Sequence, residues 1–167
     1  IHKNPWWEYK HDTYELPDGS VGNYYYAQTR GMSIVIPVMP DGRVVIIKQY
    51  RYLNQRDCWE FPGGGLKDGQ TPEDAARAEL QEEAGLLAHD LTFLAEAEPS
   101  NGLVKDRTYF WLARVSPIQT NKPDGSELIS ETKQVTALEF DRLIAQGEIW
   151  CGQTLSAWCL AKAKGLV

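Results

Sequence analysis

The sequence has little positive charge for its length. Its 167 residues include 17 Lys and Arg against 23 Asp and Glu, a net charge of −6, and no run of Lys and Arg reaches four residues. Binding to long nucleic acid needs a basic face, so this composition argues against nucleic acid as a partner. A polyphosphate ligand would need bound cations or a few well-placed arginines.

Cysteines and long apolar runs are also scarce. The three cysteines, Cys58, Cys151 and Cys159, are odd in number and lack the spacing of metal ligands, which favours a reduced, cytoplasmic setting. No apolar run approaches about 18 residues and no signal-peptide pattern is found, so we expect a soluble protein without a membrane partner. Internal repeats and linkers are absent, and the length suits one full core.

Alternating apolar and turn-forming segments predict an α/β fold with a mixed sheet covered on both faces. Residues 9–16 and 20–27 read as two strands around the turn "LPDGS", and residues 32–39 and 43–50 read as a hairpin around "PDG". We also expect strands at 91–97 and 107–115, and helices at 139–146 and 153–164.

A helix with clear ends is predicted between Thr71 and Gly85. Thr71 can cap its N-terminus, Pro72 suits the first helical position, and Gly85 suits the position after the last turn. Asp74 stands three residues after Thr71, where a capping box has Glu or Gln. A small apolar stripe within the helix can pack on a sheet: Ala75, Ala76, Leu80 and Ala84.

Three glutamates gather at the end of this helix. Glu79, Glu82 and Glu83 share one side of its last turn, where like charges repel by about 0.2–0.5 kcal/mol per pair. One interpretation is a solvated helix face. The other is a site for a hard cation such as Mg²⁺, which is favoured by the three glycines at 63–65 because they let a ligand approach the backbone.

The segment "GGLKDGQTPEDAARAELQEEAGL", which begins at Gly64, resembles the Nudix box. That pattern reads Gly, five residues, Glu, seven residues, Arg-Glu-aliphatic, one residue, Glu-Glu, one residue, Gly-aliphatic. Gln70 stands where the family has Glu, and Ala78 stands where it has an Arg that orients the glutamates. Arg77 points about 100° around the helix from that position. The matching positions are Gly64, Glu79, Leu80, Glu82, Glu83, Gly85 and Leu86.

The resemblance implies a metal site. The family's ligands correspond to the Gly63 carbonyl, Glu79 and Glu83, with Glu82 close by, and the expected metal is Mg²⁺ or Mn²⁺. In an enzyme that hydrolyses a diphosphate, clustered metals neutralise oxygens, activate water and stabilise the leaving phosphate.

Further segments are similar to the Nudix subgroup that cleaves ADP-ribose and other nucleoside diphosphate sugars. "PDGRVVIIKQYRY" is followed by "WEFPGG", and the subgroup places the equivalent of Arg51 near the diphosphate and that of Glu60 beside the metals. Pro99 stands about where the subgroup has a Pro-Gly turn lining the site. The hairpin at 9–27 matches an arm that the subgroup exchanges across a homodimer.

The resemblance also suggests where the general base lies. In this subgroup it is often on a loop before the last strand, here "NKPDGSELISETK" at 121–133. Glu127 is the first candidate; Glu131, which we expect to belong already to the strand, is the second, and Glu82 is the third. Among the N-terminal aromatic residues, Trp6 and Tyr25 are candidates for stacking on the base of a nucleotide.

The sequence thus predicts a Nudix α/β/α sandwich at 31–167 with an N-terminal antiparallel β-hairpin arm at 1–30. The expected activity is Mg²⁺-dependent hydrolysis of a nucleoside diphosphate sugar of the ADP-ribose, ADP-glucose or GDP-mannose type to a nucleoside monophosphate and a sugar phosphate. Two alternatives stay open: a metal-poor domain that senses nucleotide sugars, and a pyrophosphohydrolase of RNA 5′ ends.

Overall fold

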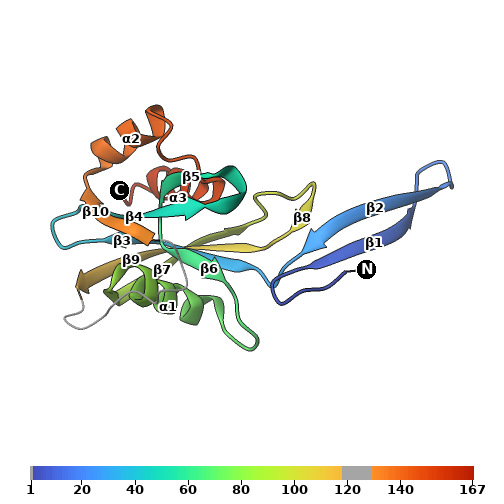
Figure 1. The fold of residues 1–167 in the computed structure, drawn as a ribbon, viewed down its shortest axis with the longest axis horizontal. Helices are drawn as coiled ribbons and strands as arrows, with labels where there is room; N and C mark the ends of the chain where they lie inside the picture. The colour runs from blue at the N-terminus through green and yellow to red at the C-terminus, as the bar shows by residue number, and fades with distance from the viewer. Residues whose placement is uncertain (1, 118–128) are drawn as a thin grey trace.

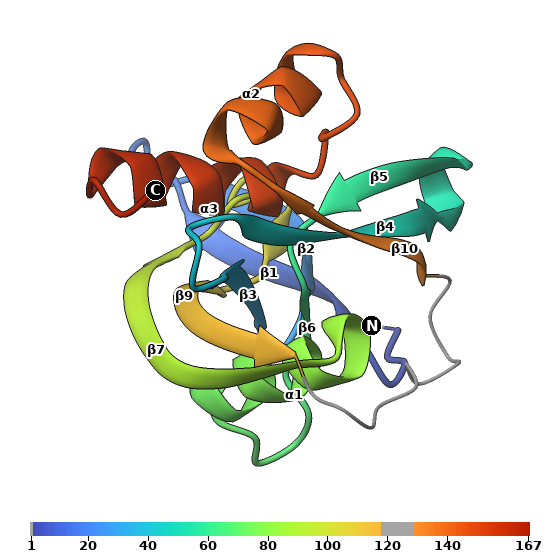
Figure 2. The same cartoon turned by 90° about the vertical axis from the view of Figure 1, so that its left-hand side faces the viewer.

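The body of the protein is an α/β/α sandwich from which a long arm projects. A computed structural model describes residues 2–117 and 129–167. A seven-stranded sheet separates helix α1 from helices α2 and α3, as Figure 1 and, after a quarter turn, Figure 2 show. Strands β1 and β2 form the arm, which extends to the right in Figure 1. The predicted α/β architecture is confirmed.

Fourteen elements make up the described residues. In chain order they are β1 (Glu8–Glu15), β2 (Val21–Gln28), β3 (Met32–Val38), β4 (Val44–Arg51), the 3₁₀ turn η1 (Tyr52–Asn54), β5 (Arg56–Glu60), β6 (Gly63–Gly65), α1 (Pro72–Ala84), β7 (Leu86–Ala97), β8 (Val104–Lys105), β9 (Thr108–Pro117), β10 (Ile129–Val135), α2 (Ala137–Ala145) and α3 (Gly152–Ala163). In the described parts of the chain, no helix has the length and apolar character needed to cross a membrane.

The main sheet is mixed, with the order β10-β4-β3-β9-β7. Strands β3 and β9 run parallel, with Met32 opposite Thr108, whereas the other paired strands of this sheet are antiparallel. Strand β5 pairs with β4, and β6 pairs with β3. The central position of β3 explains its almost continuous burial, because both of its edges and both of its faces are covered.

Alternation along the central strands divides the core into two clusters. Ile34 and Ile36 point to the layer of α2 and α3, where they join Phe140 and Trp158, whereas Val35 points to α1 and packs with Leu80. Successive strand residues face opposite sides of a sheet, so a run of β-branched residues fills both layers.

The structure changes several element boundaries expected from the sequence. The β3–β4 hairpin is present, but its one registered pair, Val38 with Val44, lies beside the turn, because β6 occupies the first half of that edge of β3. The three glycines at 63–65, which are not among the expected strands, form β6. Strand β7 begins at Leu86 rather than at 91. The loop predicted at 121–133 becomes strand β10 from residue 129, and its earlier part lies outside the described residues.

The arm is a regular antiparallel hairpin, as predicted. Strands β1 and β2 stay in register from Glu8 opposite Gln28 to Glu15 opposite Val21. Strand β8, from the body, pairs in parallel with the end of β2 and ties the base of the arm to the sandwich. Both faces of the hairpin carry exposed aromatic side chains: Tyr9, Tyr14, Tyr24 and Tyr25.

Candidate active site

The ends of helix α1 are where the sequence places them. The Thr71 side chain accepts a hydrogen bond from the backbone N–H of Asp74 at 3.1 Å, and Gly85 ends the helix in the left-handed region with φ +63°. Ala76 and Leu80 are fully buried against the sheet. This packing fixes the rotation of the helix and directs the three glutamates to the other side of its last turn.

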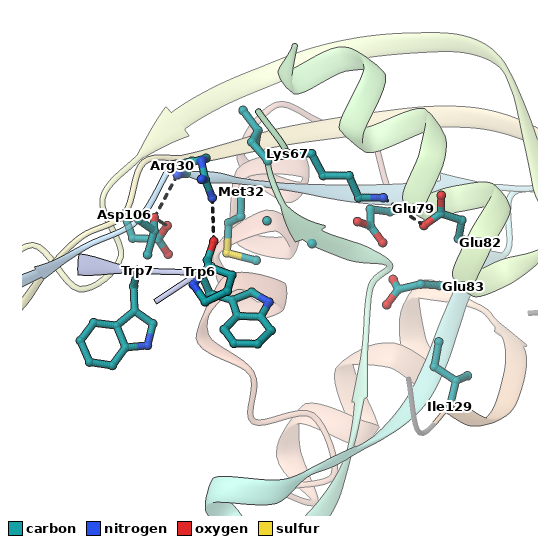
Figure 3. A pocket seen from close by; sticks show the side chains of 16 residues that line it. Trp6, Trp7, Arg30, Met32, Lys67, Glu79, Glu82, Glu83, Asp106 and Ile129 are labelled. Carbon is teal, nitrogen blue, oxygen red and sulfur yellow. Dashed lines mark hydrogen bonds and ion pairs between the residues drawn. The ribbon is translucent and has the colours of Figure 1, made fainter. Parts of the chain in front are cut away.

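The glutamate cluster lies at an electrostatically unfavourable end of the helix. Glu79, Glu82 and Glu83 lie near the C-terminus of α1, whose last turn has no basic residue, and Figure 3 shows all three beside one cavity. The C-terminus of a helix carries a partial negative charge, which adds to the mutual repulsion of the carboxylates. Such an arrangement gains stability from a cation.

The glycine strand β6 lies directly against these carboxylates. The Gly63 N–H donates a hydrogen bond of 2.7 Å to Glu83 Oε2. A Cβ atom at Gly64 would lie 2.7 Å from Glu79 Cδ and closer still to its Oε1. A side chain at position 64 would therefore displace the Glu79 carboxylate, which explains in physical terms why this position is a glycine.

A fourth carboxylate, Glu60, lies buried at the end of β5. It is 1% exposed, and its Oε2 accepts a hydrogen bond of 2.7 Å from Arg51 Nη2. Its Oε1 is buried without a hydrogen-bond partner among the described residues. Burial acts to lower the pKa of the Arg51 guanidinium, but the hydrogen bond and the charges of Glu60 and Glu83 raise it above its ordinary value. Arg51 therefore stays charged beside the carboxylates.

A cavity of about 590 Å³ opens between the helix and the N-terminal segment. The three glutamates form one wall, and Trp6 and Trp7 lie across from them in Figure 3. The remaining lining residues are Pro5, Thr29, Arg30, Gly31, Met32, Gly64, Gly65, Leu66, Lys67, Asp106 and Ile129.

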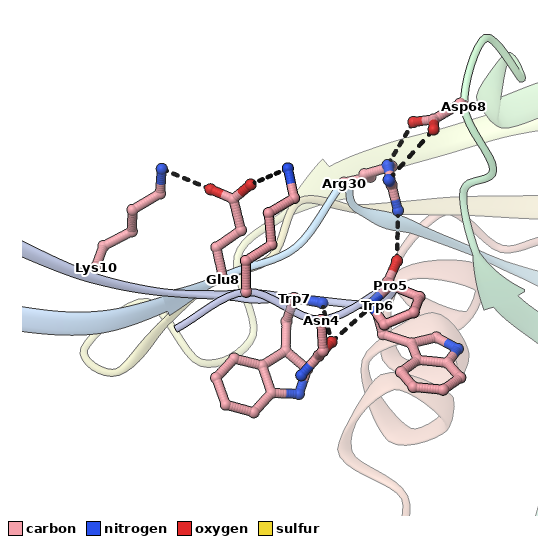
Figure 4. Close-up of polar contacts among 9 residues, drawn as sticks. Asn4, Pro5, Trp6, Trp7, Glu8, Lys10, Arg30 and Asp68 are labelled. Carbon is pink, nitrogen blue, oxygen red and sulfur yellow. Dashed lines mark hydrogen bonds and ion pairs between the residues drawn. The ribbon is translucent and has the colours of Figure 1, made fainter. Parts of the chain in front are cut away.

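The N-terminal segment is held over this cavity by polar contacts, shown in Figure 4. The Asn4 side chain accepts hydrogen bonds from the backbone N–H groups of Trp6 and Trp7, both at 2.9 Å. Arg30 Nη1 donates to the Pro5 carbonyl at 2.8 Å, and its Nε lies 2.6 Å from Asp68 Oδ1. Arg30 thus joins the tryptophan segment to the loop before α1.

The structure brings most of the site residues predicted from the sequence together and separates a few. Gly63, Glu79, Glu82 and Glu83 lie around the end of α1, and Trp6 lines the cavity. Arg51 pairs with Glu60, and the charge of Glu83 helps to raise the pKa of Arg51. Tyr25 stacks on His11 in the arm, Pro99 lies in the turn after β7, and Glu131 is exposed on β10. Glu127 lies outside the described residues.

Sequence reasoning did not select two cations at the cavity, Arg30 and Lys67. The ammonium of Lys67 lies 3.8 Å from Glu82 Oε2. The position of Lys67, between the glycines and the acid-bearing helix, is a signal that sequence reasoning could have used. No comparable signal marks Arg30, because its role depends on contacts with residues far apart in the chain.

The donor chemistry of the site fits a hard divalent cation. Carboxylate oxygens and a backbone carbonyl are the ligands that Mg²⁺ and Mn²⁺ prefer, and the buried, unpartnered Oε1 of Glu60 is a polar atom that a cation would satisfy. Within residues 2–117 and 129–167, however, no three His, Cys, Asp or Glu side chains are already gathered around a single cation position.

The chain belongs to the Nudix family, because the model of the NUDIX domain matches residues 28–155. ADP-ribose pyrophosphatase of Bacillus subtilis (strain 168) is 28% identical over 144 residues, which cover 86% of this chain and 78% of the relative. The chain is thus a Nudix hydrolase related in sequence to an ADP-ribose pyrophosphatase.

Two further comparisons differ in how much of the chain they cover. RNA pyrophosphohydrolase of Pseudomonas savastanoi pv. phaseolicola (strain 1448A / Race 6) is 53% identical over 45 residues, which are only 27% of this chain and 28% of that protein. A crystal structure of ADP compounds hydrolase superposes with a TM-score of 0.83 at 20% identity. That match covers 100% of this chain and 92% of the other. It supports the fold.

Proposed function

We propose that this protein hydrolyses the diphosphate bond of a nucleoside diphosphate sugar, with ADP-ribose as the first candidate substrate, to a nucleoside monophosphate and a sugar phosphate. The observation that carries the proposal is the meeting of the α1 glutamates with the glycine strand beside an open cavity. The relation to ADP-ribose pyrophosphatase over most of the chain supports the choice of substrate.

The reaction is proposed to depend on Mg²⁺ or Mn²⁺. The residues that would hold the metal are Glu79, Glu83, the carbonyl of Gly63 and Glu60, whose buried Oε1 has no hydrogen-bond partner among the described residues. A bound divalent ion would supply charge neutralisation on the diphosphate and an activated water. Nudix hydrolases generally use divalent metals, which agrees with this donor set.

Other residues of the chain bind and orient the substrate. Arg51 offers a planar fork of N–H donors to phosphate oxygens, and its contact with Glu60 keeps the fork beside the carboxylates. Trp6 is 75% exposed and presents a flat face at the cavity, on which a base can stack. For the proton that must leave the attacking water, Glu127 is the first candidate base, followed by Glu131 and Glu82.

Both alternatives drawn from the sequence have weaker support. An RNA 5′-end substrate rests on a match that covers only 27% of the chain, and the net charge of −6 does not favour RNA. A sensor without turnover rests on Gln70 and Ala78, the two departures from the Nudix box.

We also propose that the arm at 1–30 mediates a homodimer in a reducing, cytoplasmic compartment. An isolated hairpin is marginally stable in water, and here Tyr14 and Tyr25 are about half exposed on opposite faces of the arm. Sedimentation of the intact chain should therefore give a dimer. Deletion of residues 1–27 should give a monomer or an aggregate with weaker nucleotide binding, and a fully active monomer would refute the proposal.

A substrate panel with two matched variants tests the proposed reaction. ADP-ribose, ADP-glucose and GDP-mannose are offered with Mg²⁺ or Mn²⁺, and release of nucleoside monophosphate is measured. Glu83→Gln should lower turnover by about 100-fold or more, because it removes a charged ligand from the site. Glu73→Gln is the control, since Glu73 lies on the same helix but pairs with Arg77 in the first turn.

The outcomes separate the alternatives. Turnover of Glu83→Gln at the parent rate would refute the metal assignment. Tight binding of ADP-ribose without release of product would favour a domain that senses nucleotide sugars. Activity confined to triphosphorylated RNA would favour a pyrophosphohydrolase of RNA 5′ ends.

A further inference from the structure

One of the two departures from the Nudix box, Ala78 in place of Arg, removes a cation from the glutamate cluster. Residues four apart on a helix are neighbours, so an Arg at position 78 would stand next to Glu82. This chain has Ala78 there. The cluster then keeps its three carboxylates at the negative end of the helix without the positive charge that the box normally provides.

Arg77, the adjacent cation, does not fill this role. Its Nη2 lies 2.9 Å from Glu73 Oε1, and its Nη1 donates to the carbonyl of Ala88 at 3.2 Å. These contacts direct the guanidinium toward the first turn of the helix and the start of β7.

Lys67 reaches the cluster from the loop instead. Its Nζ lies 3.8 Å from Glu82 Oε2, and Figure 3 shows the side chain extending along the cavity wall toward that carboxylate. Lys67 and Arg30 are the two cationic residues in the described lining of the cavity, and Arg30 is engaged by Asp68 and the Pro5 carbonyl. Of these two lining residues, Lys67 is therefore the one placed to act on Glu82.

The second departure, Gln70, builds the turn that presents Lys67. Gln70 Oε1 accepts a hydrogen bond of 3.0 Å from the backbone N–H of Lys67, and the Gln70 N–H donates to the Lys67 carbonyl at 3.1 Å. The loop is also fixed on both sides of Lys67, by the Leu66 N–H bond to the Gly31 carbonyl and by the contact of Asp68 with Arg30. An amide can accept this backbone hydrogen bond without adding a further negative charge.

We propose that Lys67 replaces the missing box arginine as the cation that holds Glu82 in position, with Gln70 fixing the loop that carries it. Lys67 is a positioning residue, because it acts through Glu82. The inference rests on the proposed function and goes beyond it: the chain has kept an active glutamate cluster by moving its positive charge from the helix to the loop.

The test measures Mn²⁺ binding to the metal-free protein, thermal unfolding, and steady-state hydrolysis of ADP-ribose. Lys67→Met should tighten Mn²⁺ binding by about two- to fivefold, because a competing unit charge about 4 Å from a carboxylate is removed in a wet site. The same variant should lower kcat by roughly tenfold with KM little changed, because Glu82 loses its fixed position. Lys67→Arg should behave like the parent protein.

Two further variants locate the effect. In a Glu82→Gln background, Lys67→Met should no longer change Mn²⁺ affinity, because its partner is gone. Ala78→Arg added to Lys67→Met should restore both kcat and Mn²⁺ affinity. Lys164→Met is the matched control, since Lys164 is an exposed residue at the end of α3.

Each other result overturns the inference. Unchanged Mn²⁺ affinity and kcat in Lys67→Met would show that the ion pair between Lys67 and Glu82 is only a surface contact. A raised KM with retained kcat would indicate that Lys67 binds the substrate instead of positioning Glu82. Failure of Ala78→Arg to restore kcat or Mn²⁺ affinity would refute the replacement of the box arginine by Lys67. If the parent protein hydrolyses none of ADP-ribose, ADP-glucose and GDP-mannose, the proposed function fails, whereas the Mn²⁺ measurements on the metal-free protein still decide the role of Lys67.

Discussion

Replacing the three consecutive glycines of β6 by alanine, one at a time, should give three different results. At Gly64, a Cβ atom would stand 2.7 Å from Glu79 Cδ, whereas ordinary contacts begin at 3.4 Å and contacts under 3.0 Å are essentially never seen. Because Glu79 Oε1 would lie closer still, the carboxylate must retreat by at least about 0.7 Å. A misplacement of about 1 Å can cost 100-fold in rate, so Gly64→Ala should lower activity by roughly 10- to 100-fold. Because only the end of a flexible side chain moves, the melting temperature should stay within about 2 °C.

The neighbouring glycines provide the comparison. A Cβ at Gly63 would meet backbone atoms of β3, with Ser33 O at 2.5 Å and Ile34 Cα at 3.0 Å. Overpacking against backbone costs about 1–3 kcal/mol, which lowers the melting temperature by about 2–12 °C in a chain of this size. At Gly65 the nearest atom is Gly31 O at 3.9 Å, so Gly65→Ala should change stability by less than about 0.5 kcal/mol.

The assay combines thermal unfolding with hydrolysis of ADP-ribose in the presence of Mn²⁺. The relative melting temperatures of the three glycine variants test the packing of β6, and this test does not depend on the identity of the substrate. Full activity in Gly64→Ala, or an equal loss of activity in Gly65→Ala, would refute the placement of the Glu79 carboxylate against this strand.

Three further predictions concern the base, the helix cap and the cysteines. Glu127→Gln should lower kcat by about 10²- to 10⁴-fold and remove the acidic limb of the pH–rate profile; a loss of less than about tenfold would move the base to Glu131 or Glu82. Thr71→Ala should destabilise the protein by about 0.5–2 kcal/mol in a denaturant titration, since the cap loses its hydrogen bond to the Asp74 N–H, and an unchanged midpoint would contradict this. Iodoacetamide at pH 8 should label the exposed Cys159 first, because burial raises the pKa of the Cys58 thiol to about 11 and also raises that of Cys151, and Cys159→Ser should abolish the rapid phase seen by mass spectrometry.

Local signals in the sequence determined the helix that carries the acids. Thr71, Pro72 and Gly85 act through hydrogen bonds and φ angles within a few residues of themselves, so both ends of α1 follow from the order of residues. The spacing of Glu79, Glu82 and Glu83 likewise requires them to share one side of the last turn. The strands of the arm and the apolar central strands were predictable for the same reason, since alternation is a local pattern.

Tertiary structure decided what those acids face. Three glycines carry no side-chain pattern, and only their pairing with β3 makes them a strand whose backbone N–H reaches Glu83. The contact of Arg51 with Glu60 crosses two paired strands, and it becomes visible only when the register of β4 and β5 is known.

The cavity shows most clearly which features the sequence predicts and which depend on tertiary structure. The sequence contains Trp6, Arg30 and Lys67, but they are separated by tens of residues, and nothing in their local surroundings states that they meet. Their convergence depends on how the arm leaves the sheet and on how the loop before α1 folds back on Arg30. The sequence by itself determined the acid-bearing helix and its ends, because these depend on neighbours along the chain. The opposite wall of the site and the cation beside Glu82 were decided by tertiary structure, because those contacts join segments far apart in the chain.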